Sequence, residues 1–303
     1  TQNTAVGSGA VRLTTTGNYN TGVGYQALAQ NTTSSQNTAV GAYALDANTT
    51  AANNTAVGYN SLSANTTGTS NTGVGQAALQ TNTTAANNTA LGKSALAYNT
   101  TGDSNTAVGK DALGSNTTAA GNTAVGGLAL STNTTSGENT AVGYASLEVN
   151  TGASNTAVGY SALDSNTTGT LNTAVGANAL DANTTGVYNT GIGAGALGAN
   201  TTANNNTAVG RSSLAVNTTG AQNVSVGSDA LDANTTASNN TAVGYASLSA
   251  NTTGDRNTAV GGNSMNANTT GSNNAACGID ALKTNTTGTS NTAVGREALE
   301  FNT

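Results

Sequence analysis

The sequence predicts an all-β fold, a parallel β-solenoid (β-roll) of 18 coils with 17 residues per coil. A motif of five residues, Asn-Thr-Ala-Val-Gly or a close variant, recurs at a fixed spacing from Asn3 to Asn291. Counted from its first Asn, position 5 is Gly in all 18 repeats and position 9 is Leu in 16 of them. Because so short a repeat cannot bury a hydrophobic face alone, each repeat must be one coil that packs on its neighbours.

The repeats fill the chain, and a repeat array extends its core along one axis without thickening. We therefore expect residues 1–303 to form a single continuous solenoid domain whose last repeat is truncated. One repeat is a residue short, because a Thr is missing after Asn150. The repeats begin at Asn3, Asn20, Asn37, Asn54, Asn71, Asn88, Asn105, Asn122, Asn139, Asn155, Asn172, Asn189, Asn206, Asn223, Asn240, Asn257, Asn274 and Asn291.

Two short strands per repeat are expected, at positions 2 to 5 and 7 to 10. Gly and β-branched residues recur too densely for an α-helix, and Val and Thr favour strands. Gly at position 5 ends the first strand, either because the backbone there has a positive φ or because another backbone approaches closely. Val at position 4 and Leu at position 9 are predicted to form the core columns. Cys277, which replaces Val at position 4, is then a small buried hydrophobic residue.

Asparagine occupies two fixed places, positions 1 and 12. The run Asn-Thr-Thr-Gly at positions 12 to 15 predicts the return turn, since Asn tolerates left-handed backbone and closes turns with its side chain. If both asparagines face inward, their amides can form hydrogen bonds from coil to coil, as stacked amides do in cross-β structures.

The first strand has apolar or small residues on both faces, because Ala at position 3 and Val at position 4 point to opposite sides. If Val faces inward, the small residues at position 3 form a stripe outside and predict an oligomer interface. The reverse orientation exposes Val and makes the outer stripe more hydrophobic still, so either orientation favours a partner. A thin interior that tolerates Ala outside is the alternative without a partner. The candidate interface residues are Ala56, Gly73, Ala90, Ala107 and Ala124.

The composition leaves little for catalysis. Charged residues make up 7% of the chain, the net charge is -6, and there is one Cys and no His. We therefore expect no enzyme activity, no catalytic or metal-binding residues, no cofactor, no nucleic-acid partner and no membrane insertion. Acidic side chains at position 10 of consecutive repeats are interpreted as solvated surface, and the tyrosines at position 6 as a variable exposed site. These residues are Glu148, Asp164 and Asp181, and Tyr25, Tyr59, Tyr144, Tyr160 and Tyr245.

Asn-Thr-Thr at positions 12 to 14 is also an acceptor sequence for N-glycosylation in 15 repeats. The candidate glycosylation sites include Asn31, Asn48, Asn65 and Asn82. Turn formation alone also explains these asparagines, and a glycan on every coil would be crowded.

The run Asn105–Gly109, followed by Ala112 and Leu113, resembles the head repeat of trimeric autotransporter adhesins. It also resembles the repeat arrays of phage-tail-fibre-like surface proteins. The adhesin resemblance implies a left-handed coil and a trimer in which three rolls associate through their first strands. The repeat here is slightly longer than the adhesin repeat.

Two functions are compatible with these features. The first is a structural extracellular fibre or filament at a cell or virion surface, with copies of itself as partners in a homotrimer or an end-to-end filament. An adhesive role would add a host surface or glycans as partners. The alternative is a solenoid that binds ice or another ordered surface through its Thr ladders at positions 2, 13 and 14. A polysaccharide-processing enzyme is the least favoured function.

Overall fold

The computed structural model describes residues 2–302, and the chain divides into two compact units between Thr151 and Gly152. This division falls inside the one repeat that lacks a residue. Each unit contains nine strands of three residues, and no helix is present among the described residues. Consequently no helix in residues 2–302 could cross a membrane. That the two units form one continuous domain stays a prediction.

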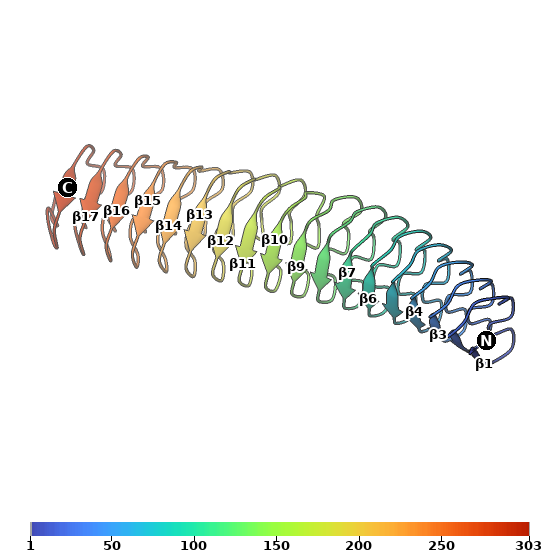
Figure 1. Ribbon diagram of the computed structural model, residues 1–303. Coiled ribbons are helices and arrows are strands. Elements are labelled where there is room, and N and C mark those ends of the chain that lie inside the picture. The colour runs from blue at the N-terminus through green and yellow to red at the C-terminus, as the bar shows by residue number, and fades with distance from the viewer. Residues whose placement is uncertain (1, 303) are drawn as a thin grey trace. The chain divides into compact units, whose positions relative to one another are not determined.

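Every strand covers positions 2 to 4 of a repeat (Figure 1). The strands of the first unit are β1 (Thr4–Val6), β2 (Thr21–Val23), β3 (Thr38–Val40), β4 (Thr55–Val57), β5 (Thr72–Val74), β6 (Thr89–Leu91), β7 (Thr106–Val108), β8 (Thr123–Val125) and β9 (Thr140–Val142). Those of the second unit are β10 (Thr156–Val158), β11 (Thr173–Val175), β12 (Thr190–Ile192), β13 (Thr207–Val209), β14 (Val224–Val226), β15 (Thr241–Val243), β16 (Thr258–Val260), β17 (Ala275–Cys277) and β18 (Thr292–Val294).

Neighbouring strands within each unit pair in parallel and in register. In the first unit Thr38 lies opposite Thr55 and Ala39 opposite Ala56, so identical repeat positions stack on one another. The second unit repeats this arrangement from β10 to β18. Both units are therefore parallel β-solenoids, which confirms the predicted fold class at this level.

The strands face the opposite way from the prediction, with Ala at position 3 inside the coil and Val at position 4 outside. Ala39 is fully buried, whereas the adjacent Val40 is 36% exposed, and this pattern recurs along both units. The reason is that the interior at position 3 is narrow. A Cβ atom added to Gly73 would lie 2.7 Å from Ser61 Oγ and 3.4 Å from Leu62 Cδ1. Even Ala would be tight at Gly73, and the alanines at position 3 of other repeats are fully buried, which leaves no room for the larger Val. The prediction of Val as a core column is therefore wrong.

The predicted second strand is also wrong, because positions 6 to 11 form turns. Leu28 and Leu45 at position 9 have left-handed backbones, with φ of 54° and 50°. Such a conformation costs an L-residue about 1–2 kcal/mol. It is offset because the leucine side chain is fully buried and its amide donates to the next coil, as Leu28 N does to Ala44 O at 2.9 Å. The predicted Leu core column is confirmed.

Glycine at position 5 meets both of the conditions expected for it. Gly58 has a φ of 135°, which disfavours L side chains. A Cβ atom there would also lie 2.5 Å from the carbonyl oxygen of Gly75 in the next coil. Any larger residue would have to push adjacent coils apart.

The asparagines at positions 1 and 12 form buried ladders, as predicted, although position 12 of the first repeat is Thr14. At position 12, Asn65 Nδ2 donates to Asn48 Oδ1 at 3.2 Å and to the carbonyl oxygen of Gly68 at 2.9 Å. At position 1, Asn54 Nδ2 donates to the same carbonyl at 2.9 Å, and Asn54 Oδ1 accepts from the amide of Asn71. The second unit contains the same network. The buried ladder amides described here are thus paired, which avoids the penalty of an unsatisfied polar group, although Asn122 Nδ2 has no hydrogen-bond partner among residues 2–302.

Candidate functional site

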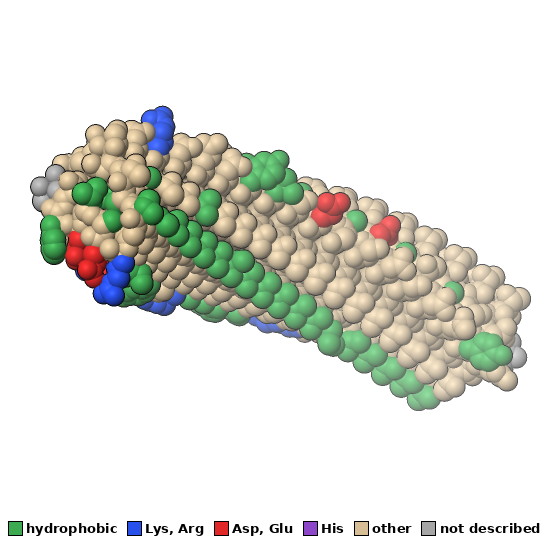
Figure 2. Space-filling view, turned by 60° about the vertical axis from the view of Figure 1, so that its left-hand side comes forward, with side chains coloured by type: hydrophobic (Ala, Val, Ile, Leu, Met, Phe, Trp, Pro, Cys, Tyr) green, Lys and Arg blue, Asp and Glu red, His purple; other side chains and the backbone are tan. Residues whose placement is uncertain are grey.

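The outer face of the strands is the most uniform surface of each unit. Side chains alternate along a strand, so Thr at position 2 and Val at position 4 both point outward when position 3 points inward. We call this surface the Thr-x-Val face. Its position-4 side chains include Leu91, which is 48% exposed, and Ile192, which is 39% exposed. Figure 2 shows hydrophobic side chains in a row on the surface, as a column of outward-facing valines requires.

No charged residue occupies positions 2 to 4 of any repeat. Val224 and Ala275 replace Thr at position 2, and both are small uncharged residues. Cys277 replaces Val in β17 and is exposed, so the prediction of a buried cysteine is wrong. It follows the valines to the outside because they share position 4. The Thr-x-Val face is therefore an uncharged, half-apolar strip on the strands of each unit.

The predicted interface residues do not lie on this surface. The five residues at position 3 point into the coil and are buried, so the prediction that they contact another subunit is wrong. They are Ala56, Gly73, Ala90, Ala107 and Ala124. The outward neighbours of these residues, one position further along each strand, are Val57, Val74, Leu91, Val108 and Val125. A contact through the first strand must therefore use the valine column.

The predicted glycosylation sites are incompatible with the folded coil. The side chains of Asn31, Asn48, Asn65 and Asn82 are fully buried. Each Nδ2 atom, which would carry the glycan, already donates hydrogen bonds to the preceding coil and to the carbonyl at position 15. These asparagines stabilise the turn, and the alternative explanation by turn formation holds.

The Thr rows do not all share one surface. Position 2 belongs to the Thr-x-Val face, whereas positions 13 and 14 belong to the return turn. At position 13 the hydroxyl is used by the protein itself. Thr66 Oγ1 donates to the carbonyl oxygen of Thr83 in the next coil at 3.1 Å, and the same bond recurs in both units. The position-2 row is therefore the Thr row that lies beside valine, and the exposed threonines at position 14 form a separate row on the return turn.

Acidic residues at position 10 lie beside each other in the second unit. Burial raises the pKa of both Asp164 and Asp181. The negative charge of Asp164 raises the pKa of Asp181 further. Glu148 belongs to the first unit. Across residues 2–302 no group of three or more His, Cys, Asp or Glu side chains is placed to hold a metal ion. The absence of catalytic residues stays a prediction.

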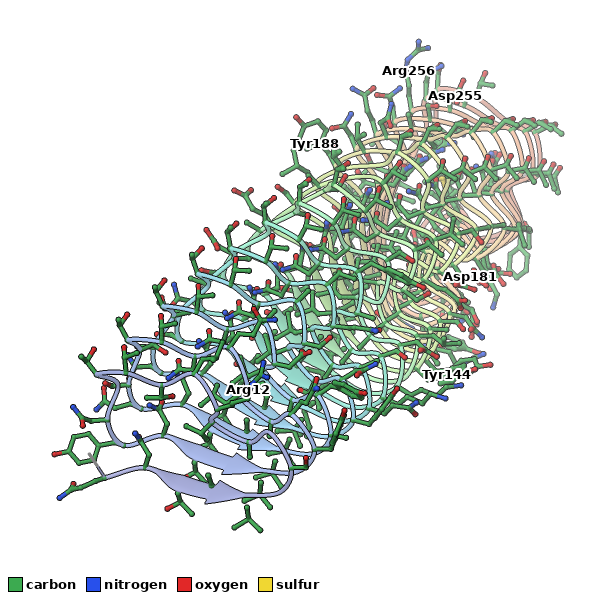
Figure 3. The ribbon with its side chains drawn as sticks, turned by 90° about the vertical axis from the view of Figure 1, so that its right-hand side faces the viewer. Arg12, Tyr144, Asp181, Tyr188, Asp255 and Arg256 are labelled. Carbon is green, nitrogen blue, oxygen red and sulfur yellow. The ribbon has the colours of Figure 1, made fainter. Side chains whose placement is uncertain are left out.

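The variable positions project away from the coil. In the second unit Tyr188, Asp255 and Arg256 extend from one edge, and Asp181 extends from another (Figure 3). These positions differ between repeats, in contrast to the uniform Thr-x-Val face.

The chain matches no protein-family model, and comparison with curated proteins found no similar sequence.

Proposed function

We propose that this chain is a structural element of an extracellular fibre, in which copies associate along the Thr-x-Val face. One observation supports this proposal above the others: every strand of both units presents an outward apolar residue at position 4, between small uncharged neighbours. A continuous apolar strip of this kind is typical of a surface that is covered in the assembled state.

Repetition gives this contact its strength. Complete burial of one Val side chain contributes about 1.5–3 kcal/mol, and part of that is realised at a half-exposed position. The losses of translational and rotational freedom on association arise once for the whole interface. A weak contact on each coil therefore adds up to a stable interface when nine coils of a unit contribute.

The finer features of the proposal are a homotrimer, a left-handed coil and a place on a cell or virion surface with an adhesive role. They rest on the resemblance of the repeat to adhesin heads and tail-fibre arrays. The outward direction of the valine column supports association through the first strand, the contact that the adhesin resemblance implies.

The native mass of the intact chain tests this proposal. Sedimentation equilibrium should give three times the 29.2 kDa mass of one chain. Replacing Leu91, Val108 and Val125 with Lys places like charges along the interface and should yield single chains with an unchanged β signal in circular dichroism. The control replaces exposed turn residues of the same repeats, Thr101, Thr118 and Thr135, with Lys and should leave the mass unchanged. A wild-type chain that sediments alone would overturn the proposal.

Binding to ice or another ordered surface is the second candidate. It is favoured by the regular alternation of Thr and Val on the outer face, with strands spaced about 4.8 Å apart. This function requires the face to be free, so the protein would sediment as single chains and inhibit ice recrystallisation. Loss of that inhibition in the Leu91, Val108 and Val125 to Lys variant, with the turn variant still active, would support it.

A further inference from the structure

Three tyrosines of successive repeats cluster on one edge of the first unit. Tyr25 and Tyr59 come from position 6 of their repeats, and Tyr43 comes from position 7 of the repeat between them. The ring centroids of Tyr25 and Tyr43 are 5.3 Å apart, and those of Tyr43 and Tyr59 are 6.2 Å apart. Their planes are nearly perpendicular, at 84° and 82°. Edge-to-face packing of this kind holds the rings in fixed orientations.

A shallow surface depression of about 480 Å³, which we call the tyrosine cavity, opens widely to solvent beside two of these rings. It is lined by Tyr43, Asp46, Tyr59, Asn60, Ser63 and Ala64. The two rings stand nearly perpendicular to each other, at 82°, and Asp46, Asn60 and Ser63 supply polar groups. Aromatic walls with a few converging polar atoms are the usual construction of a small-molecule site.

Asp46 supplies the charge of this cavity. Its Oδ1 atom is buried and has no hydrogen-bond partner among residues 2–302. Asp46 also forms no salt bridge to any described Lys or Arg. The backbone amides of Asp46 and Ala47 favour the charged carboxyl group, but Oδ1 stays unpartnered and no positive charge in the described part of the chain faces it. A bound cation would supply that charge.

We propose that this cavity binds an organic ammonium group, and a quaternary ammonium more tightly than a primary one. A cation over the face of a Tyr ring is attracted by the negative face of the ring, and quaternary ammonium ions are recognised by aromatic cages of this kind. Asp46 adds an opposite charge beside the rings. A primary ammonium has three N–H donors that need acceptors, whereas methyl groups need only the aromatic walls that Tyr43 and Tyr59 provide.

The inference would give the adhesive role in the proposed function a chemical target, but it does not depend on association of copies. The cavity lies at positions 6, 7 and 10, whereas the Thr-x-Val face uses positions 2 and 4. Ligand titration and native mass therefore report on separate surfaces. Either proposal can fail while the other holds.

Calorimetric titration of the intact chain with choline tests the charge requirement. The matched probe is 3,3-dimethylbutan-1-ol, which has the shape of choline without its charge. Choline should bind at one site and at least about tenfold more tightly than the neutral probe. Ethanolamine should bind more weakly than choline. Phosphocholine and Nε-trimethyllysine then distinguish a lipid or polysaccharide head group from a methylated protein as the source of the ammonium group.

Two variants and two controls locate the site. Asp46→Asn and Tyr43→Ala should each weaken choline binding by about tenfold or more. If Tyr43→Ala loses the β signal in circular dichroism, Tyr59→Leu removes the other ring of the cavity and takes its place in the test. The controls Asp232→Asn and Tyr245→Ala change equivalent positions of the second unit and should leave binding unchanged. Equal binding of the neutral probe, full binding by Asp46→Asn, or tighter binding of methyl glucoside than of choline would overturn the proposal.

Discussion

The same repeat positions carry different side chains in the two units, and their surfaces differ accordingly. Positions 6, 7 and 10 of three successive repeats form the tyrosine cavity in the first unit and an ion pair in the second. The first set comprises Tyr25, Tyr43, Asp46 and Tyr59, and the second set comprises Arg211, Asp229, Asp232 and Tyr245. In the second set Arg211 Nη2 lies 3.0 Å and 2.8 Å from the two carboxylate oxygens of Asp229.

The backbone is the same under both sets. Tyr43 and Asp229 at position 7 have φ of 58° and 56°, and the leucines two residues further on, Leu45 and Leu231, are fully buried. Arg211 and Asp229 pair with each other in the second set, whereas no described Lys or Arg pairs with a side chain of the first set. The Oδ1 atoms of Asp46 and Asp232 are both buried without a hydrogen-bond partner among residues 2–302, so the tyrosine rings beside the carboxylate are what distinguishes the first set. The comparison shows that the coil fixes where a side chain stands, and that exposed variable positions decide what it binds.

The largest expected effect tests whether the two interiors are equivalent. Leu45→Asp and Leu231→Asp each bury an unpaired charge, so each should lower the free energy of unfolding by at least about 3 kcal/mol. Thermal and denaturant unfolding followed by circular dichroism would measure this. The control Asp46→Ala, at a half-buried surface position of the same repeat as Leu45, should change little. If one leucine variant unfolded with nearly the wild-type free energy, the interiors of the two units would not be equivalent.

The next largest effect is expected when the tyrosine-cavity residues are transferred to the equivalent positions of the second unit. Arg211→Tyr with Asp229→Tyr and Ala246→Asn builds the tyrosine cavity into the second unit, where the backbone at position 7 already has the required φ. Choline titration should then show two sites where the wild type shows one. The reverse change, Tyr25→Arg with Tyr43→Asp, should remove the site from the first unit. An unchanged stoichiometry in both variants would mean that residues outside these positions determine binding.

The sequence predicted the features that depend on a single residue type at a fixed position. Gly at position 5 and Asn at positions 1 and 12 have few other uses at such a spacing, and the structure confirms the role of each. The orientation of the first strand was not predictable in this way. Ala and Val are both apolar, so alternation gave no contrast between the two faces, and only the narrow interior beside position 3 decided the orientation.

The second strand and the tyrosine cavity were missed for different reasons. Positions 7 to 10 form a turn, with left-handed backbone at positions 7 and 9, because inter-coil hydrogen bonds and burial of Leu override local preference. Tyr43 was missed because it stands at position 7, one place away from the column that contains Tyr25 and Tyr59. Stacking the repeats as rows, and searching diagonally as well as down each column, would have brought the three tyrosines together.

Removing the ion pair of the second unit should have a smaller effect, a modest loss in the free energy of unfolding. Arg211 is 65% exposed, so water and salt screen its attraction to Asp229. Arg211→Gln should lower the free energy of unfolding by no more than about 1 kcal/mol, and the loss should shrink at high salt. Denaturant unfolding at low and high ionic strength would measure it. A larger loss that salt does not change would show that packing of Arg211, and not its charge, maintains this surface.

The smallest expected effect is on the pH dependence of stability. It distinguishes the two position-10 carboxyl groups, Asp46 in the first unit and Asp232 in the second. Burial raises the pKa of Asp46 and of Asp232, and the charge of Asp229 raises that of Asp232 further. A carboxyl with a raised folded pKa favours the folded state in acid, and this stability is lost as the pH rises through the folded pKa. Asp46→Asn and Asp232→Asn should therefore be slightly stabilising at neutral pH, by no more than about 0.5 kcal/mol, with the gain vanishing below the ordinary value of 3.8.

The variant Asp229→Asn sharpens this last prediction. It removes a charge near Asp232 and leaves Asp46 untouched, so carbon NMR titration of the carboxyl groups should show the pKa of Asp232 falling and that of Asp46 unchanged. Asp232 would remain above its ordinary value, because burial is the larger cause. A fall of both pKa values would mean that the two units respond together to a local change. A constant Asp232 would mean that burial alone sets its proton affinity, and that the ion pair beside it has no electrical influence at position 10.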